Sequence, residues 1–278
     1  MKTHPLKKTQ DEDVHFFVRE IEHENPYDFS KIHRHTYFEI LLFEKGNKGS
    51  QIIDFVEYEI KSKCLYIVAP NQVHLLKRQK NENGILIQFT KEFLQNSISP
   101  IQFDWLFSLQ TNPEIELSKN GFETLYQSFL QLKNICNNQH TYQSFQVKHY
   151  FAFLFFQILE ILPSPTKVFT EKNTTFQFLE LAEKNFSKLR MVSDYVKLLN
   201  VSKSKLNNDV KESLGKTPLQ IIHDLLMLEI KRLLVIEQRS NKEISYLLHF
   251  DSPSTFNRFV LKQTGLKPSV LKSQIAHF

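Results

Sequence analysis

The chain has 278 residues, of which 41% are hydrophobic and 23% charged, and a chain of this length is expected to form two domains with sizeable cores. Only two cysteines occur, Cys64 and Cys136, which excludes a disulfide framework and favours the cytoplasm. Residues 1–13 contain no apolar segment of the kind found in signal peptides, so export is not expected. The most hydrophobic stretch, Tyr150–Leu162, is shorter than the roughly 20 residues of a membrane span, which excludes a transmembrane protein.

Positive charge is concentrated in the C-terminal part of the chain. Residues 1–169 contain 18 Lys and Arg against 19 Asp and Glu, a net charge of −1. Residues 170–278 contain 17 against 11, a net charge of +6. A basic domain beside a near-neutral one indicates that only the second contacts a polyanion, either a nucleic acid or an anionic membrane surface.

The segment from residue 14 to residue 89 has the spacing of β-strands. Short apolar runs alternate there with stretches rich in Gly, Asn, Pro and Lys, which favour turns. The four clearest runs are Phe38–Phe43, Gln51–Val56, Cys64–Val68 and Gly84–Phe89. This pattern predicts a small antiparallel barrel or sandwich.

Helical spacing replaces strand spacing after Lys91. One helix is predicted from Phe122 to Leu132 and a second from Phe145 to Leu162. The second is apolar on nearly all sides, so it is either buried within its own domain or shared with a second subunit. Prolines and polar residues then indicate a linker. The predicted boundaries are residues 1–162 for the first domain, 163–175 for the linker and 176–278 for the second domain.

The second domain contains an internal repeat with an offset of 50 residues. Residues 202–218 and 252–268 share six identities, where chance gives about one. The identical pairs are Ser202 and Ser252, Ser204 and Ser254, Asn207 and Asn257, Val210 and Val260, Gly215 and Gly265, and Pro218 and Pro268. Each copy has a short amphipathic helix, a turn, a capping serine and a second helix, which predicts two helix-turn-helix units. Ser240 and Glu243 predict a capping box in the second copy, and a long helix over Leu219–Glu237 joins the copies.

The side chains that would face DNA follow from the predicted core register. The second helix of such a unit enters the major groove, so if Leu206 and Val210 face the core, the opposite face meets the bases. Asn suits adenine and Arg suits guanine. The predicted base-reading residues are Ser204, Asn207, Asn208, Ser254, Asn257 and Arg258. The predicted phosphate-binding residues are Lys203, Lys205, Lys211, Lys216, Lys262 and Lys267. The alternative is that both helices merely present solvated polar faces.

These C-terminal segments resemble the AraC-type transcription regulators. The segments that carry the resemblance include Leu199–Ser202, Gly215–Pro218, Phe256–Phe259 and Gly265–Pro268. The resemblance implies an α+β protein of two domains: a cupin-like N-terminal β-barrel with following helices, which senses and dimerises, and an all-α domain with two helix-turn-helix units. We further expect double-stranded DNA, an unknown small-molecule effector and RNA polymerase as partners, and a homodimer in the cytoplasm. We expect no membrane contact, no cofactor and no enzyme activity. A departure is His249, where the family often has glycine.

Four residues of the first domain resemble the cupin pattern in which histidines and a glutamate surround a metal. They are His33, His35, Glu39 and His74. On a strand the first three project to the same face, and the fourth can arrive from a neighbouring strand. Such a donor set suits zinc, iron, manganese or nickel. The other interpretations are an organic effector pocket without metal, which we favour, a structural polar cluster, and a metal-dependent cupin enzyme, which leaves the C-terminal repeat unexplained.

Overall fold

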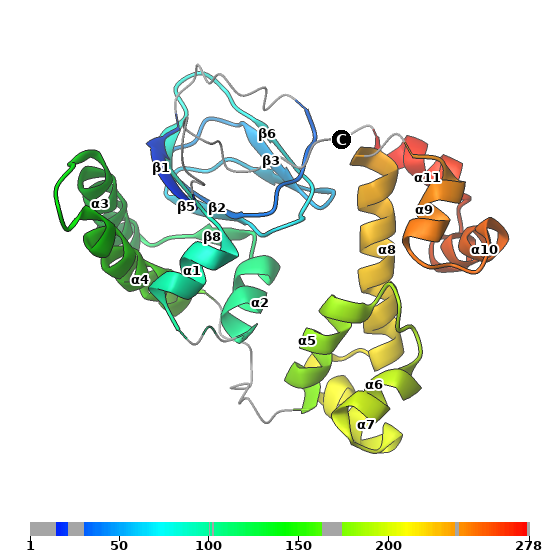
Figure 1. Cartoon of the computed structure of the whole chain (residues 1–278). Coiled ribbons are helices and arrows are strands. Elements are labelled where there is room, and N and C mark those ends of the chain that lie inside the picture. Colours follow the sequence, from blue (N-terminus) through cyan, green and yellow to red (C-terminus); the bar gives the residue numbers. More distant parts are fainter. Residues whose placement is uncertain are drawn as a thin grey trace. The chain divides into compact units, whose positions relative to one another are not determined.

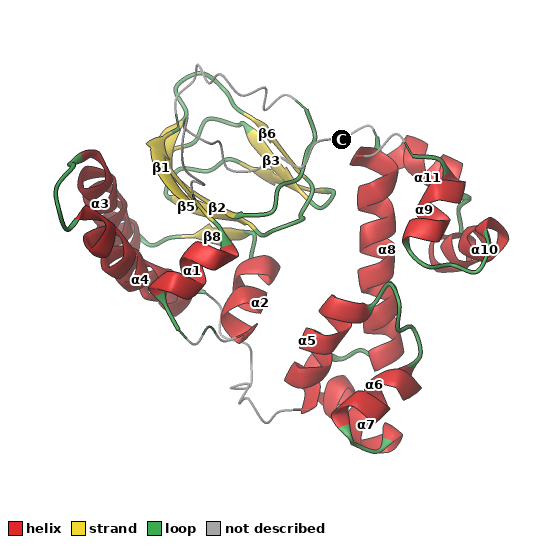
Figure 2. Cartoon of the chain, in the orientation of Figure 1, coloured by secondary structure: helices red, strands yellow, loops and turns green. Residues whose placement is uncertain are grey.

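The computed structural model describes residues 15–21, 31–99, 101, 103–162, 174–236 and 239–276. The chain divides into two compact units, residues 2–163 and residues 164–278. Every described strand belongs to the first unit, and the described part of the second unit is helical (Figure 2). The predicted α+β fold of two domains is confirmed.

Two antiparallel sheets form the core of the first unit (Figure 1). The larger sheet has the strand order β1-β7-β2-β5-β8, and the smaller one has the order β4-β3-β6. The strands are β1 (Phe16–Glu20), β2 (Phe38–Lys45), β3 (Ser50–Ile53), β4 (Val56–Glu59), β5 (Cys64–Val68), β6 (His74–Lys77), β7 (Asn83–Phe89) and β8 (Glu114–Glu116). Three of the four predicted apolar runs lie within single strands, β2, β5 and β7, which supports the expected antiparallel architecture.

The run Gln51–Val56 differs from its prediction as a single strand. It is the hairpin of β3 and β4, in which Ile53 pairs with Val56. Between them Asp54 and Phe55 have φ angles of +45° and +71°. Two successive residues in the left-handed region form a tight turn that fits the twist of a hairpin. The Asp-Phe pair lacks the glycine that usually indicates such a turn, so the spacing of apolar residues alone did not predict the turn.

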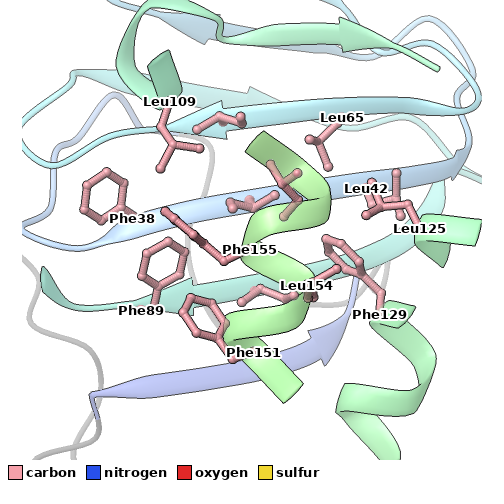
Figure 3. Packing of buried hydrophobic residues seen from close by; sticks show 14 of the residues in the cluster. Phe38, Leu42, Leu65, Phe89, Leu109, Leu125, Phe129, Phe151, Leu154 and Phe155 are labelled. Atoms are coloured by element: carbon pink, nitrogen blue, oxygen red, sulfur yellow. The ribbon is translucent and has the colours of Figure 1, made fainter. Parts of the chain in front are cut away.

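Alternation along the strands gives the large sheet two different faces. One face carries Phe38, Ile40 and Leu42 of β2 and is covered by helices. These helices are α1 (Lys91–Ser97), α2 (Phe103–Thr111), α3 (Lys119–Asn137) and α4 (Gln143–Ile161). In Figure 3, Phe151, Leu154 and Phe155 of α4 lie over Phe38, Leu42, Leu65 and Phe89 of the sheet. The other face carries Leu41 and Phe43 and packs against residues of the smaller sheet.

Helix α4 confirms the prediction of a helix that is apolar nearly all round, but its own unit does not enclose it. Phe151 and Phe155 are buried, whereas Phe145 and Phe153 are 62% and 55% exposed. Full burial within the unit, one of the two alternatives, is therefore wrong. None of the described helices is long and apolar enough to cross a membrane.

The second unit is built around the long helix α8. Its helices are α5 (Thr174–Asn185), α6 (Val192–Leu199), α7 (Lys203–Leu214), α8 (Pro218–Ile236), α9 (Asn241–Leu247), α10 (Pro253–Thr264) and α11 (Pro268–Ile275). Helices α5, α6 and α7 lie toward the start of α8, and α9, α10 and α11 lie toward its end (Figure 1). Helix α5 begins two residues before the expected domain start, because Thr174 and Thr175 are buried helical residues. The rest of the predicted linker, residues 163–173, lies outside the described residues.

The 50-residue repeat corresponds to two equivalent helices. Both α7 and α10 have 12 residues. Ser202 and Ser252 cap their N-termini, and Gly215 and Gly265 end them with φ angles of +68° and +74°. Leu206 and Val210 of α7 are buried, as predicted, and so are Phe256 and Val260 of α10. The two copies are thus one structural unit used twice.

We expect Gly265→Ala to lower the free energy of unfolding of the second unit by about 1 kcal/mol. A Cβ added there would meet nothing within 4 Å, so the cost comes from the left-handed backbone alone. Asparagine tolerates this backbone better than alanine, so Gly265→Asn should lose less. Urea denaturation followed by circular dichroism measures both values. Equal losses for the two variants would contradict the backbone explanation.

Candidate DNA interface and histidine cluster

The first helix-turn-helix consists of α6, a three-residue turn and α7. Asn200 ends α6 in the left-handed region, with φ +52° and ψ +45°. Ser202 then starts α7, and its Oγ accepts a hydrogen bond of 3.1 Å from the backbone N–H of Lys205. This cap satisfies one of the free donors at the start of the helix. The turn and the cap together fix the direction in which α7 leaves α6.

The second helix-turn-helix consists of α9, a longer turn and α10. The predicted capping box is confirmed: the Ser240 N–H donates to Glu243 Oε2 at 2.7 Å, and the Glu243 N–H donates to Ser240 Oγ at 3.2 Å. His249 has a φ of +58°, so it adopts the left-handed conformation for which glycine is best suited. The departure from the family pattern is therefore accommodated by backbone strain and not by a different turn.

Arg190 anchors the second turn, which the sequence did not predict. Its guanidinium carbon lies 3.8 Å from the centre of the Phe250 ring, a cation–π contact. Its Nη2 donates to the carbonyl oxygens of Ser187 and Leu248. Arg190 precedes α6 and Leu248 follows α9. This side chain therefore connects the first helix-turn-helix to the second within the C-terminal domain.

The structure places the predicted base-reading residues on the faces opposite the cores of α7 and α10. Five of the six are exposed, namely Ser204, Asn208, Ser254, Asn257 and Arg258. The sixth, Asn207, is half-buried, and its Nδ2 donates to the Lys203 carbonyl at 2.8 Å. Two polar faces of matching position on the repeated helices are the arrangement that base reading requires. The base contacts themselves stay a prediction.

The six predicted phosphate-binding lysines are all exposed. Two of them form ion pairs within the chain: Lys205 Nζ lies 2.9 Å from Asp209 Oδ2, and Lys216 Nζ lies 2.7 Å from Asp224 Oδ2. The first contact lowers the pKa of Asp209. Exposed pairs of this kind contribute at most about 1 kcal/mol, so a DNA phosphate can compete for either lysine. The phosphate contacts also stay a prediction.

Part of the second unit matches a known family of protein domains. Residues 195–274 match the family model described as a helix-turn-helix domain. Residues 195–274 are a helix-turn-helix domain of the AraC type. The resemblance in the C-terminal hundred residues is thereby confirmed. The match supports DNA binding by residues 195–274.

Three solved structures are similar to this chain. A structure of ToxT from Vibrio cholerae is 16% identical, with 93% of this chain and 97% of ToxT covered and a TM-score of 0.45. Another, from Vibrio cholerae O395, is 15% identical, with coverages of 95% and 99% and a TM-score of 0.46. A regulator with an AraC-type DNA-binding domain from Chromobacterium violaceum is 21% identical, with coverages of 37% and 92% and a TM-score of 0.33. No curated protein matches the chain.

The histidine cluster lies where β2 and β6 begin. The ligand atoms of His35, Glu39 and His74 all lie within 4.8 Å of one another, and all three residues are buried. His33 is adjacent, with its ring centre 4.2 Å from that of His74, but its Nδ1 is hydrogen-bonded to the Lys31 carbonyl at 2.9 Å. The structure thus brings three of the four predicted residues into one donor set. A strand had been expected at His33 and His35, but the regular pairing of β2 starts only at Phe38. His33 instead forms an isolated antiparallel bridge with His74.

Burial controls the charge of this cluster. It lowers the pKa of His74 well below its usual value, and the neighbouring His35 and His33 lower it further. Burial also raises the pKa of Glu39 to about 6, although a hydrogen bond from Gln88 and the charge of Arg19 act in the opposite direction. At neutral pH the cluster therefore contains a neutral His74 and an ionised Glu39.

The donor set fits a divalent transition metal. A neutral imidazole and a carboxylate are the forms that bind such ions, and three protein ligands leave a position open. His74 Nε2 and Gln51 Oε1 are buried with no hydrogen-bond partner among the described residues, so the site has polar atoms that a ligand would satisfy. An organic ligand with a polar group would satisfy them equally, so both interpretations stay predictions.

Several polar residues around the cluster were not predicted from the sequence. Gln88 Nε2 donates to Glu39 Oε2 at 2.6 Å, and Gln51 Nε2 lies 3.4 Å from His74 Nδ1. Arg19 of β1 lies close enough to Glu39 to influence its pKa. Each of the three interrupts an apolar strand at a position that points between the sheets. A polar residue at an inward strand position is the signal that could have identified them.

We expect acid to destabilise the first unit through His74. Because the pKa of His74 is lower in the folded than in the unfolded chain, stability is lost as the pH falls below the unfolded value of about 6.5. When the pH falls from 7 to 5, the free energy of unfolding of His74→Gln should therefore decrease by about 1–2 kcal/mol less than that of the wild-type protein. Urea denaturation followed by the fluorescence of Trp105, the only tryptophan, measures the first unit.

The exposed His149 of α4 supplies the matched control for this measurement. The His149→Gln variant should follow the wild-type curve. Glu39 works in the opposite direction, because its raised pKa makes the folded state more stable as the pH falls from about 6 toward 4.5. The free energy of unfolding of the wild-type protein therefore falls less steeply with decreasing pH than His74 alone would cause. Parallel plots of this free energy against pH for His74→Gln and wild type would contradict the prediction.

Proposed function

We propose that the chain is a sequence-specific regulator whose two helix-turn-helix units read adjacent segments of one DNA duplex. The observation that carries the proposal is the duplication: α7 and α10 have the same length and the same caps, and both expose polar faces. They are connected through α8, whose 19 residues span about 28 Å. That length is comparable with the roughly 34 Å between successive major-groove turns on one side of DNA.

Control by a small effector is the second part of the proposal. The space between the two sheets contains Glu39, Gln51, His74 and Gln88, all buried. Two atoms of this set, His74 Nε2 and Gln51 Oε1, are buried with no hydrogen-bond partner among the described residues. Such atoms cost free energy, and a ligand of the first unit would supply the partner. An effector acts only if it binds two arrangements of the protein with different affinity.

Dimerisation through α4 is the third part. Its exposed aromatic side chains, including Phe145, Phe153 and Phe156, form an apolar surface of the kind that marks protein contacts. A homodimer would present two copies of the double helix-turn-helix to DNA. In this proposal the protein acts in the cytoplasm and contacts RNA polymerase, with double-stranded DNA as its principal partner.

Fluorescence anisotropy with duplexes tiled upstream of the protein's own and neighbouring genes tests the proposal. We expect tight binding to one tile and much weaker binding to a scrambled duplex. The logarithm of the affinity should fall steeply with the logarithm of the salt concentration, since lysines displace counterions from phosphates. Equal and weak binding to every tile would contradict sequence-specific recognition.

A further inference from the structure

The backbone of Arg190 belongs to the first helix-turn-helix. It lies in the segment between α5 and α6, and the carbonyl of the preceding Leu189 accepts a hydrogen bond of 2.8 Å from the Tyr195 hydroxyl. Tyr195 of α6 is fully buried, and its ring centre lies 5.3 Å from that of Phe178 of α5. Arg190 Nη2 also donates to the Ser187 carbonyl of the same segment at 3.1 Å. The core between α5 and α6 therefore holds the base of this side chain in place.

The guanidinium of Arg190 interacts with three residues in the turn of the second helix-turn-helix. Its Nη2 donates to the Leu248 carbonyl, at the end of α9, where carbonyls have no partner within the helix. Its central carbon lies 3.8 Å from the centre of the Phe250 ring. Burial lowers the pKa of Arg190, and the Asp251 carboxylate acts in the opposite direction. One side chain thus binds this turn through a hydrogen bond, a cation–π contact and an attraction between charges.

Phe250 connects this contact to α10, the helix that carries Arg258. Phe250 is 4% exposed, and its ring centre lies 5.3 Å from that of Phe256 and 5.6 Å from that of Phe259. Aromatic rings at these distances pack in preferred orientations. A movement of the second turn relative to Arg190 would therefore also move α10.

The two turns of the repeat differ in length at the place that Arg190 contacts. Asn200 and His249 are the left-handed residues of the two turns, with φ angles of +52° and +58°. One residue separates Asn200 from the serine that caps α7, whereas two residues, Phe250 and Asp251, separate His249 from the serine that caps α10. The departure from the exact repeat thus falls on two of the residues with which Arg190 interacts.

Helix α8 is the other connection between the two helix-turn-helices. It packs against α7 toward its start and against α9 and α11 toward its end (Figure 1). The ring centre of His223 of α8 lies 5.2 Å from that of Phe259 of α10. Helix α8 sets the separation along its own axis, whereas the rotation of one helix-turn-helix about that axis depends on side-chain contacts. Arg190 supplies such a contact from a segment outside α8.

We infer that Arg190 is a positioning residue, which fixes the rotation of the second helix-turn-helix relative to the first. In this way it sets the spacing of the two DNA segments that the protein reads together, without contacting a base itself. This inference rests on the proposed function, because it concerns two units acting on one duplex. Each added base pair rotates a DNA segment by about 35°. A protein with a fixed rotation therefore discriminates strongly between spacings, and a protein without it discriminates weakly.

Pulsed electron paramagnetic resonance tests the fixed rotation without DNA. Spin labels at Lys211→Cys of α7 and Leu261→Cys of α10 report the distance between two exposed positions that the 50-residue offset relates. Cys64→Ala and Cys136→Ala remove the native thiols, which lie in the first unit. We expect a narrow distribution of distances when Arg190 is present. Arg190→Met should broaden it, because additional arrangements become populated.

Anisotropy titrations of the unlabelled full-length protein test the consequence for DNA. The probes are the tile that binds most tightly, the same tile with either half scrambled, and the same tile with one to five base pairs inserted at its centre. Arg190→Met should weaken binding to the intact tile about 10-fold, because the second unit is no longer held in place for its segment. Its affinity for the half-scrambled tiles should equal that of the wild-type protein. Insertions should weaken the variant less than the wild-type protein.

Lys188→Met is the matched control, because Lys188 lies in the same segment, is exposed and loses the same charge. It should change neither the distance distribution nor the preferred spacing. Arg190→Lys keeps a cation for the Phe250 ring and loses the planar fork, so it should restore part of the spacing preference even if Arg190→Met fails to fold. An unchanged distance distribution, equal losses on intact and half-scrambled tiles, or equal effects of Lys188→Met and Arg190→Met would overturn the inference.

The two measurements separate this inference from the proposed function. If the wild-type protein binds no tile but Arg190→Met broadens the distance distribution, the positioning role is supported and the reading of adjacent DNA segments is wrong. If the wild-type protein binds one tile and neither measurement distinguishes Arg190→Met from it, the regulator is supported and the role of Arg190 is wrong.

Discussion

Replacing Arg258 by alanine is expected to relax the choice of base pair at one position of the operator. Arg258 is exposed on α10, on the face opposite the buried Phe256 and Val260. A paired hydrogen bond from arginine to guanine contributes about 1–3 kcal/mol of discrimination. The variant should therefore lose roughly 5- to 150-fold in affinity for the specific duplex and much less for a scrambled one. Anisotropy titrations on both duplexes give the ratio.

Asn208→Ala extends this prediction to the first copy. Asn208 occupies the position of α7 that matches Arg258 of α10 in the 50-residue offset, and it is also exposed. An asparagine pairs with adenine in the way that an arginine pairs with guanine. The two variants should relax two different base pairs, separated by the distance between the two helices on DNA.

Lys203→Ala is the control for both variants. Lys203 is exposed in the first turn of α7, beside the base-reading face. A phosphate contact has no sequence information, so its loss should weaken specific and scrambled duplexes alike and reduce the salt slope by about 1. If all three variants lost affinity equally on both duplexes, the assignment of base-reading residues would be wrong.

The helices of the second unit could be predicted from the sequence because their signals are local. Helix caps and core spacing depend on residues within a few positions of one another. Ser202, Ser240 and Gly265 therefore indicated helix ends that the structure confirms. The contacts of Arg190 could not be predicted in this way because its partners, Leu248 and Phe250, are about 60 residues away in the chain.

The first unit was less predictable because its contacts are long-range. The donor set of His35, Glu39 and His74 could be proposed, since its spacing resembles a known pattern. Arg19 could not be associated with Glu39, because their proximity depends on the pairing of β1, β7 and β2. The order β1-β7-β2-β5-β8 places strands from both ends of the region side by side. No local pattern encodes that order.

Replacing Phe151 by alanine is expected to cost the first unit about 3–5 kcal/mol of unfolding free energy. The Phe151 ring is 1% exposed. Its centre lies 5.4 Å from that of Phe16, 4.9 Å from that of Phe89 and 5.1 Å from that of Phe93. The side chain thus connects α4 to β1, β7 and α1, and alanine would leave a cavity among all of them. Urea denaturation monitored by Trp105 measures the loss.

Phe153→Ala, two residues further along α4, is the matched control. Its side chain is 55% exposed, so the same truncation should change the stability of the monomer by about 0.5 kcal/mol or less. In a dimer formed through α4, however, Phe153 becomes a contact residue, and its loss should raise the dimer dissociation constant. Sedimentation equilibrium on both variants separates folding from assembly. A stability loss for Phe153→Ala as large as that for Phe151→Ala would show that the outer face of α4 is covered within the unit itself.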